Sequence, residues 1–331
     1  MKRTIKIQKV DFYDKLFDKV FGKRLEKYYQ LEFTDKPDFL FYSVYDTGCE
    51  HYKYSDCVKI FYSTEGVIPD FNECDYGIGS YPMKVGNRYC QIPYNPVSRE
   101  QLERKNIVAF KDKKFCNFVY SNATNGRGAI LRQEFCKELM KYRHVDCPGQ
   151  VLNNMRDAIE PRNGDWYRGK VEFIKDYKFT IAFENVAMPG MVTEKIIQAF
   201  EAGSVPIYWG DSMVTDLFNS NAFINCNDYS NWDEVIERVK ELDNDEKKYM
   251  DMLVSNPFNQ NYDFDYDKKV EQFLCDIIEK GKVIYEKDPL GWDSGRISGE
   301  KMMKIKKSKS EKIKEVKKKF FRQINSLMQK I

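Results

Sequence analysis

Histidine and long hydrophobic runs are scarce in this sequence, and each shortage excludes a class of protein. With only His51 and His144 in 331 residues, there is little material for a histidine-rich metal site or a Ser-His-Asp triad. No apolar run reaches the roughly 18 residues that a membrane-spanning helix needs, and the N-terminal segment lacks the apolar core of a secretory signal. We therefore expect a cytoplasmic protein.

Paired cysteines are also lacking. The nine cysteines are odd in number, scattered, and include no Cys-x-x-Cys pair, which favours a reducing compartment over a disulfide framework. Cys49, His51 and Cys57 could surround a metal, but unliganded thiols are the commoner outcome. The spaced aspartates at 263–267 could hold Mg²⁺, yet they precede a Lys-rich helical start rather than end a core strand. We expect no metal site and no bound cofactor.

Apolar residues are plentiful, because 42% of the chain is hydrophobic and 15% is aromatic. A chain of 331 residues with this composition can bury two cores of ordinary size. The charge is unevenly distributed. Residues 301–331 contain 12 Lys or Arg and 2 Glu, which gives this tail a net charge of +10. The whole chain has a net charge of +3, so the first 300 residues have a net charge of about −7. Basic character is therefore confined to the tail.

The stretch at 177–211 has the pattern strand, loop, helix, strand. The apolar run Phe179 to Phe183 suits a buried parallel strand, and Ser204 to Gly210 suits a second. Between them, Thr193 stands where a helix N-cap belongs and Gly203 where a helix ends. The pattern predicts a βαβ unit of a doubly wound sheet.

Polar residues gather at the turn of this unit. Asn185 follows the first strand, and Thr193, Glu194 and Lys195 open the helix. A helix N-terminus carries partial positive charge, so Lys195 opposes it unless an anion such as a diphosphate is bound. Glu194 could accept hydrogen bonds from ribose hydroxyls. The alternative is a helix whose charges are simply solvated, and the pattern alone does not decide between the two.

The same stretch contains four motifs in a fixed order: YKF at 177–179, FEN at 183–185, TEK at 193–195 and VPIYWG at 205–210. This order resembles the donor-binding motif of the α-1,3/4-fucosyltransferases, which move L-fucose from GDP-β-L-fucose to a sugar hydroxyl. The resemblance implies that donor-binding residues lie within these motifs and that GDP-fucose is a substrate rather than a cofactor. One departure is Met191, which stands where an aromatic residue is common in the family.

A carboxylate follows a predicted core strand in the N-terminal part. Two compact strands are expected at 38–43 and 58–63, and Glu65 comes directly after the second, at an edge where open α/β sheets place ligands. A solvated loop glutamate is the alternative. The family carries FYxxE, PxFN and DYxIG motifs, which this sequence matches between 61 and 79. In bacterial members that glutamate is the proposed catalytic base, a role that the resemblance assigns to Glu65.

An arginine follows another predicted strand, at 114–121. The Asn- and Gly-rich loop 122–128 comes next, and a helix is expected from 130 to 142 with Arg132 at its beginning. A guanidinium there could reach a diphosphate bound at the sheet edge, or it could simply be solvated. In the family an arginine after a strand ending in SN contacts the donor diphosphate. Arg132 is the better match, and Arg127 is a rival.

The basic tail has its own pattern. Its apolar residues are spaced three or four apart, as on one face of a helix whose other faces carry Lys and Arg, and they are Ile313, Val316, Phe320, Ile324, Leu327 and Ile331. Such a helix suits the anionic inner face of a membrane. Dimerisation and nucleic-acid binding are the alternatives; we expect membrane contact and no nucleic acid.

Together these features predict an α/β protein with two facing Rossmann-like domains of the GT-B type and a C-terminal basic amphipathic helix. The expected domains are 1–106 for the acceptor, 107–290 for GDP-fucose, and the tail at 291–331. The resemblance implies a metal-independent, inverting transfer of fucose to a glycan, expected at O3 of GlcNAc or Glc, in which Glu65 acts as base and Arg132, Asn185, Thr193, Glu194 and Lys195 hold the donor.

The acceptor itself is not encoded in any motif that we can interpret. N-acetyllactosamine and a lipopolysaccharide-linked glycan are both compatible with the resemblance, and so are α-1,3 and α-1,4 linkages. Two other functions stay open: a transferase of the same fold that uses another nucleotide sugar, and a membrane-surface binding protein with a degenerate site.

Overall fold

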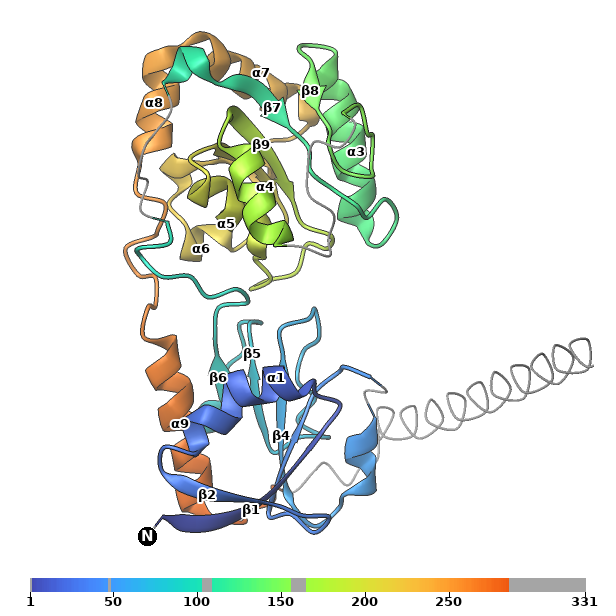
Figure 1. Ribbon diagram of the computed structural model, residues 1–331, viewed down its shortest axis with the longest axis vertical. Coiled ribbons are helices and arrows are strands. Elements are labelled where there is room, and N and C mark those ends of the chain that lie inside the picture. The colour runs from blue at the N-terminus through green and yellow to red at the C-terminus, as the bar shows by residue number, and fades with distance from the viewer. Residues whose placement is uncertain (1, 47–48, 103–108, 156–164, 286–331) are drawn as a thin grey trace, which may run out of the picture. The chain divides into compact units, whose positions relative to one another are not determined.

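The chain forms two compact α/β units, each built on its own sheet (Figure 1). The computed structural model describes residues 2–46, 49–102, 109–155 and 165–285. The first unit comprises the described residues up to Gly79, Lys84–Cys90 and those from Lys268 onward; the second comprises Ser80–Met83 and Gln91–Asp267. The tail at 291–331, and with it the expected amphipathic helix, lies outside the described residues.

The first unit contains a sheet of six strands in the order β2-β1-β3-β4-β5-β6, in which the pairs from β2 to β5 are parallel. The chain builds β2 on one side of β1 and the later strands on the other, so the sheet is doubly wound. The strands are β1 (Arg3–Val10), β2 (Tyr29–Phe33), β3 (Phe39–Tyr42), β4 (Val58–Ser63), β5 (Tyr76–Gly79) and β6 (Tyr89–Gln91).

Aromatic side chains fill the core of this unit. A continuous helical segment connects β1 to β2, and it consists of α1 (Asp14–Phe17), the π-helical η1 (Asp18–Gly22) and α2 (Lys23–Leu25). Phe17 and Phe21 of this segment are fully buried against Phe41 of β3, with ring centroids 5.6 and 4.7 Å apart. These aromatic residues have the spacing that places them on one buried face of a helix.

The last described helix, α9 (Tyr266–Lys280), lies beside β1 and β2 although it is far from them in sequence (Figure 1). Glu279 of α9 accepts a hydrogen bond from the Tyr29 hydroxyl at 2.7 Å, and Phe273 packs edge-on against Tyr76. This segment lies within residues 107–290, the second domain expected from the sequence. Its contacts place it in the first unit. The sequence could not predict this, because no local pattern in α9 identifies the strands against which it packs.

The second unit contains a sheet of five strands in the order β11-β10-β9-β7-β8, and all four neighbouring pairs are parallel. The central strand β9 is buried at every position, as expected for a strand covered on both faces. The strands are β7 (Lys114–Asn117), β8 (Val145–Asp146), β9 (Tyr177–Phe183), β10 (Val205–Trp209) and β11 (Ile224–Asn225).

Helices cover both faces of this sheet, which gives three layers. Phe179, Ile181 and Phe183 of β9 share a core with α3, α7 and α8, whereas Ala182 packs in a second core with α5 and α6. Successive residues of a strand point to opposite faces, so β9 supplies both cores. The helices are α3 (Arg127–Met140), α4 (Trp166–Ile174), α5 (Glu194–Glu201), α6 (Val214–Leu217), α7 (Trp232–Asn244) and α8 (Glu246–Val254).

The short 3₁₀ turns complete the connections in both units. They are η2 (Glu50–Lys53), η3 (Gly86–Arg88), η4 (Phe110–Asp112), η5 (Ser220–Ala222) and η6 (Cys226–Asp228).

The predicted βαβ unit is confirmed as β9, α5 and β10. Gly203 has a φ of +66° directly after the end of α5, and its N–H donates to the carbonyl of Phe200 at 3.0 Å, which is the glycine-terminated helix that the sequence predicted. At the start of α7, the side chain of Asn231 caps the helix by accepting from Glu234 N, 3.1 Å away.

Candidate active site

The order of the second sheet reverses between β7 and β9, since β8 was added on one side of β7 and β10 on the far side of β9. Open α/β sheets place ligands at such a switch point, beyond the carboxyl ends of the strands. Tyr120 and Asn122 follow β7, and Glu184 and Asn185 follow β9. The sequence motifs therefore converge on the edge where this fold offers a binding site.

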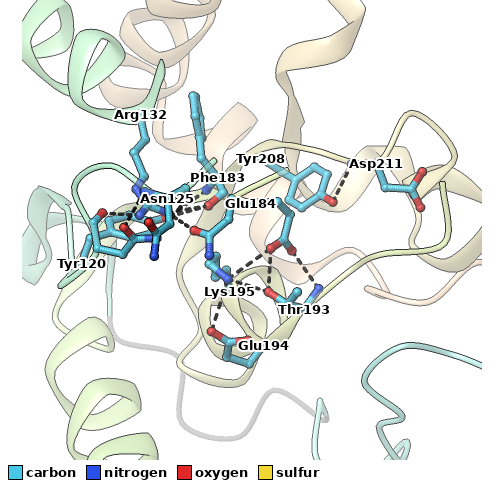
Figure 2. Close-up of polar contacts among 12 residues, drawn as sticks. Tyr120, Asn125, Arg132, Phe183, Glu184, Thr193, Glu194, Lys195, Tyr208 and Asp211 are labelled. Carbon is cyan, nitrogen blue, oxygen red and sulfur yellow. Dashed lines mark hydrogen bonds and ion pairs between the residues drawn. The ribbon is translucent and has the colours of Figure 1, made fainter. Parts of the chain in front are cut away.

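Glu184 is the centre of the polar cluster at this edge (Figure 2). Its carboxylate is fully buried and accepts two hydrogen bonds from Thr193, from the backbone N–H and from the hydroxyl, each at 2.7 Å. Lys195 forms an ion pair with the same carboxylate at 3.2 Å. The cluster therefore fastens the start of α5 to the end of β9.

The charges in this cluster depend on one another. Burial raises the pKa of Glu184, and the ammonium of Lys195 opposes that rise. Burial alone would lower the pKa of Lys195, but attraction to Glu184 and Glu194 outweighs it, so that pKa is raised. Burial would raise the pKa of Glu194, but Lys195 and Lys170 outweigh it, so that pKa is lowered. The ammonium of Lys195 and the carboxylate of Glu194 thus stay charged at neutral pH.

The hydroxyl of Thr193 does not cap α5, although Thr193 occupies the N-cap position as expected. It donates to Glu184 instead and accepts from Lys195 at 2.8 Å. From the sequence alone, Lys195 at this helix N-terminus is expected to lack an anion unless a diphosphate binds. The structure shows that Glu184 already supplies the negative charge, because the loop brings a residue eleven positions away to the ammonium.

Lys195 has three N–H donors, and three oxygens lie within reach of them. They belong to Thr193 at 2.8 Å, Glu184 at 3.2 Å and Glu194 at 3.4 Å. The contact to Glu194 is the longest, and the Glu194 side chain is 30% exposed whereas that of Glu184 is fully buried. An incoming anion would therefore displace Glu194 from Lys195 more easily than it would displace Glu184.

Arg132 and Asn185 form a second contact at the same edge. One terminal nitrogen of Arg132 donates to the Asn185 side-chain oxygen at 2.8 Å, and the other donates to the carbonyl of Asn122. The guanidinium carbon lies 3.9 Å from the centre of the Tyr120 ring, and the Arg132 side chain is fully buried. Its Nε has no hydrogen-bond partner among the described residues. Arg132 is therefore held inside the protein, with donor capacity left over.

The helix that carries Arg132 begins earlier than the sequence suggested. α3 starts at Arg127 rather than at 130, so Arg132 lies in its second turn and the exposed Arg127 stands at its start. The reason is a close approach of backbones: the N–H of Gly128 donates to the Asn185 carbonyl at 2.9 Å. A Cβ at Gly128 would lie 1.9 Å from the Glu184 carbonyl oxygen, so only glycine fits.

The loop between Asn185 and Thr193 is held by Asp211, which follows β10. The buried carboxylate of Asp211 accepts from Gly190 N and from Met213 N, each at 2.8 Å, and burial raises its pKa. Gly190 has a φ of +79°, in the left-handed region that favours glycine. Met191, at the position where the family often has an aromatic residue, is buried in this loop.

Glu65 lies in the first unit, in the loop after β4, and its side chain is exposed. Ser63 at the end of β4 orients this loop, because its hydroxyl accepts from Glu65 N at 2.9 Å. The neighbouring Thr64 lies 3.4 Å from the hydroxyl of Tyr45. The predicted donor residues all belong to the second unit, in which Arg132 meets Asn185, and Thr193 and Glu194 meet Lys195.

The sequence motifs predict neither the central role of the Glu184 carboxylate nor the helix α4. A signal for α4 was present, because Asp165 caps it by accepting from Arg168 N at 3.2 Å. The helix places Lys170 beside α5, where it influences Glu194. Lys170 is thus a further cation at this edge that the motifs did not reveal.

Within the described ranges, no group of three or more His, Cys, Asp or Glu residues is arranged to hold a metal ion. All nine cysteines are free thiols, and eight of them are buried. A search of the described helices finds none that is both long and apolar enough to cross a membrane.

Comparison with known proteins decides the family. Residues 108–283 match the model of the C-terminal part of glycosyltransferase family 10 (fucosyltransferase), and residues 7–97 match that of the alpha-(1,3)-fucosyltransferase FucT N-terminal domain. The chain belongs to glycosyltransferase family 10. The resemblance seen in the motifs at 177–211 is therefore confirmed, and the described sheets of this family 10 chain agree with the two-domain GT-B fold expected from it.

Several relatives of this family 10 protein carry names. It is 29% identical over 279 residues to the alpha-(1,3)-fucosyltransferase FucT of Helicobacter pylori, covering 70% of this chain and 55% of the relative. It is 33% identical over 122 residues to GDP-fucose protein O-fucosyltransferase 3 of Homo sapiens, covering 36% of this chain and 25% of the relative. The chain thus spans about half, or less, of the length of these curated relatives.

Two solved structures are similar to most of this chain. An alpha1,3-fucosyltransferase crystallised with GDP-fucose superimposes with a TM-score of 0.67 at 25% identity, covering 87% of this chain and 94% of that chain. The same kind of enzyme with GDP gives the same TM-score at 26% identity.

Proposed function

We propose that this protein transfers L-fucose from GDP-β-L-fucose to a glycan hydroxyl, at O3 of GlcNAc or Glc, and forms an α-1,3-fucoside. The observation that carries this proposal is the polar cluster at the switch point of the second sheet, where Asn185, Thr193, Glu194 and Lys195 occupy the FEN and TEK positions. Support comes from the family and from the similar structure that was solved with GDP-fucose.

The donor diphosphate would lie against the start of α5. We assign Lys195 and Arg132 to its negative charge, and Asn185 and Thr193 to positioning the loop around it. When a phosphate oxygen approaches Lys195, the long contact at 3.4 Å to Glu194 yields first, because it is the most exposed of the three. The released Glu194 carboxylate can then accept hydrogen bonds from the ribose hydroxyls of the nucleotide.

The reaction would be a single displacement at the anomeric carbon of fucose. The acceptor oxygen forms a bond to C1 while the bond from C1 to the β-phosphate oxygen breaks, and GDP leaves with the electron pair. Glu65 takes the proton of the acceptor hydroxyl. Lys195 and Arg132 stabilise the charge that develops on the diphosphate. One displacement inverts the anomeric centre, so the β-linked donor becomes an α-L-fucoside.

The first test is GDP release from GDP-fucose with N-acetyllactosamine as acceptor, in the presence of EDTA. Wild type should transfer fucose, because cations of the protein neutralise the diphosphate without a metal ion. Glu65→Ala should lower kcat by roughly 10²–10⁴-fold, the range of general-base catalysis. Glu32→Ala, which removes an exposed carboxylate of β2 in the same unit, should leave kcat unchanged.

The result also separates the remaining alternatives. If wild type is folded and does not bind GDP-fucose, the donor assignment is wrong, and a nucleotide-sugar panel decides between another donor and a protein without activity. Equal kcat values for wild type and Glu65→Ala, with transfer intact, would show that Glu65 is not the base. This result would not contradict the transferase function.

A protein acceptor is a second candidate, because one set of relatives is named GDP-fucose protein O-fucosyltransferase 3, at 33% identity over 122 residues in the human protein. Our proposal of a glycan acceptor, such as N-acetyllactosamine or a lipopolysaccharide-linked glycan, follows the relative from Helicobacter pylori, which matches over 279 residues. Transfer to N-acetyllactosamine and to an unglycosylated serine-containing peptide, measured side by side, distinguishes the two acceptors.

We also propose that the protein acts in the cytoplasm and contacts the inner face of the membrane through its basic tail, which carries 12 Lys or Arg. Removal of residues 301–331 should abolish binding to vesicles with anionic lipid while transfer to a soluble acceptor continues. Unchanged vesicle binding after the truncation would contradict the membrane role of the tail. If the truncation abolishes binding to nucleic acid and not to vesicles, the tail is a nucleic-acid-binding segment.

A further inference from the structure

Lys170 is a cation at the candidate donor site to which the proposed mechanism gives no role. It lies on α4, which packs against α5, and its ammonium lies 5.7 Å from the centre of the Tyr120 ring. The same ring carries the guanidinium of Arg132 at 3.9 Å. Three cations, Arg132, Lys170 and Lys195, therefore surround one edge of the second sheet.

The partners of these three cations differ. Lys195 has three oxygens within hydrogen-bond distance, and Arg132 donates to Asn185 and to backbone carbonyls. Lys170 is half-buried, yet it makes no hydrogen bond or ion pair with any residue that the structure describes. Partial burial limits the hydration of this ammonium, and a bound anion would supply an acceptor for its N–H groups.

The electrostatic surroundings of Lys170 come from every element around it. Glu194 and Lys195 belong to α5, Glu184 follows β9, Arg132 belongs to α3, and Tyr120 follows β7. Burial lowers the pKa of Lys170 to about 8, Glu194 and Glu184 oppose this, and Lys195 and Arg132 add to it. In the protein without ligand, Lys170 would therefore gain a proton when an anion binds.

We infer that Lys170 is a third diphosphate-binding cation of the donor site, and that it takes up a proton when GDP or GDP-fucose binds. The inference rests on the proposed donor site and adds a residue and a pH dependence to it. Lys170 complements Lys195, because Lys195 must give up a contact to reach the diphosphate whereas Lys170 has none to give up among the described residues. The anion restores an ordinary pKa of about 10 to Lys170.

The expected proton uptake follows from these values. At pH 8.5 an ammonium with a pKa of about 8 is about one-quarter protonated, and one with a pKa of about 10 is almost fully protonated. GDP binding at pH 8.5 should therefore take up about 0.7 proton, and binding at pH 6.5 should take up almost none. For the same reason, GDP should bind about ten-fold more weakly at pH 9 than at pH 7.

The experiment is isothermal titration calorimetry of the full chain with GDP, in buffers of different ionisation enthalpy, at pH 6.5 and 8.5. Wild type should show the proton uptake at pH 8.5. Lys170→Arg keeps a charge that does not titrate, so it should bind GDP with similar affinity and without this uptake. Lys170→Met should lose the uptake and bind roughly ten-fold or more weakly at pH 7.

The variants also separate the possible failures. If wild type does not bind GDP at either pH, the proposed donor site is wrong. If wild type binds GDP and Lys170→Arg shows the same proton uptake, the proton goes to the guanine or to another group, and the inference about Lys170 is wrong. A Lys170→Met variant that is folded and binds GDP as tightly as wild type would reduce Lys170 to a structural counter-charge for Glu194.

A second observation, independent of the first, concerns the first unit. Its sheet order reverses between β1 and β3, so its switch point lies at the ends of those strands. Tyr13 follows β1 and Tyr45 follows β3, and their rings lie 5.0 Å apart. The Tyr13 side chain is 62% exposed. A pair of aromatic rings, of which Tyr13 is exposed and Tyr45 is half-buried, thus stands where this kind of sheet binds ligands.

This pair lies next to the proposed base. The Tyr45 hydroxyl is 3.4 Å from the hydroxyl of Thr64, the residue before Glu65. Burial raises the pKa of Tyr45, and the negative charge of Glu65 adds to the rise. We propose that Tyr13 and Tyr45 form the platform on which the apolar face of the acceptor pyranose ring stacks, with its reacting hydroxyl directed to Glu65. This rests on the proposed transferase function.

The test compares acceptor-dependent transfer with the slow hydrolysis of GDP-fucose that needs no acceptor. Tyr13→Ala should raise KM for N-acetyllactosamine about ten-fold and leave hydrolysis and GDP affinity unchanged, whereas Tyr13→Phe keeps the ring and should retain the wild-type KM. Tyr28→Ala, at another exposed tyrosine of the same unit, is the control. An unchanged KM in Tyr13→Ala overturns the platform; absence of both reactions in wild type overturns the proposed function instead.

Discussion

Replacement of Glu184 by Gln should strongly destabilise the second unit, because the carboxylate is fully buried and compensates the charge of Lys195. The amide can still accept from Thr193 N, but it carries no charge. Lys195 would keep its contact with Glu194 at 3.4 Å. The Lys195 side chain is only 12% exposed, so water compensates little for the lost charge of Glu184. Removing one partner of a buried ion pair costs roughly 3–5 kcal/mol, and the remaining Glu194 contact favours the lower end, about 3 kcal/mol.

Urea unfolding followed by tryptophan fluorescence measures this cost, since three of the four tryptophans, Trp166, Trp209 and Trp232, lie in the second unit. Combining the change with Lys195→Met removes both charges, and the double variant should be more stable than Glu184→Gln alone, because no uncompensated ammonium is left. The double-mutant cycle should give a coupling of about 2 kcal/mol.

The control is Asp251→Asn, which breaks the exposed ion pair to Lys247 and should not move the unfolding midpoint. If Glu184→Gln is no more destabilising than this control, the buried carboxylate is not an essential counter-ion, and the role that we give to Glu184 is wrong.

Three further predictions concern the same unit. Burial would raise the pKa of Asp243, but Lys178 and Arg143, each 2.8 Å from its carboxylate, outweigh burial and lower it. The stability that this carboxylate contributes is therefore present above about pH 4 and lost as pH falls through the lowered pKa, and Asp243→Asn should flatten the change in the urea midpoint between pH 6 and pH 3. Gly128→Ala should lower the free energy of unfolding in urea by about 2–3 kcal/mol, because its Cβ would lie 1.9 Å from the Glu184 carbonyl oxygen. An unchanged free energy of unfolding would contradict the close approach of the two backbones. Gln198→Met should raise the free energy of unfolding by about 1 kcal/mol, since neither polar atom of the buried amide has a partner among the described residues. A lower melting temperature than that of wild type would contradict this prediction.

Local patterns were sufficient for the central βαβ unit. The strand β9 is a continuous apolar run, and Thr193 and Gly203 mark the two ends of α5, so no distant contact was needed to predict it. The start of α3 was not predictable in this way. It begins at Arg127 because the backbone at Gly128 meets Asn185, a residue 57 positions further along the chain.

The candidate site shows the same division. The motifs identified Asn185, Thr193, Glu194 and Lys195 as polar residues of one turn, and the structure brings the last three together. The role of Lys170 could not be predicted, because its importance depends on the packing of α4 against α5 and on the ring of Tyr120.

The sequence by itself determined the family, the parallel α/β class and the residues at the ends of β9 and α5, because these depend on motif order, apolar periodicity and capping, which are properties of short segments. Only the tertiary structure decided which acidic or polar group lies against each basic side chain. Lys195 is paired with Glu184, and Arg132 is buried against Asn185 and Tyr120. Lys170 lies over the Tyr120 ring and makes no hydrogen bond or ion pair with a described residue. The physical reason is that burial and separation set the strength of an electrostatic interaction, and both depend on how segments distant in sequence pack together.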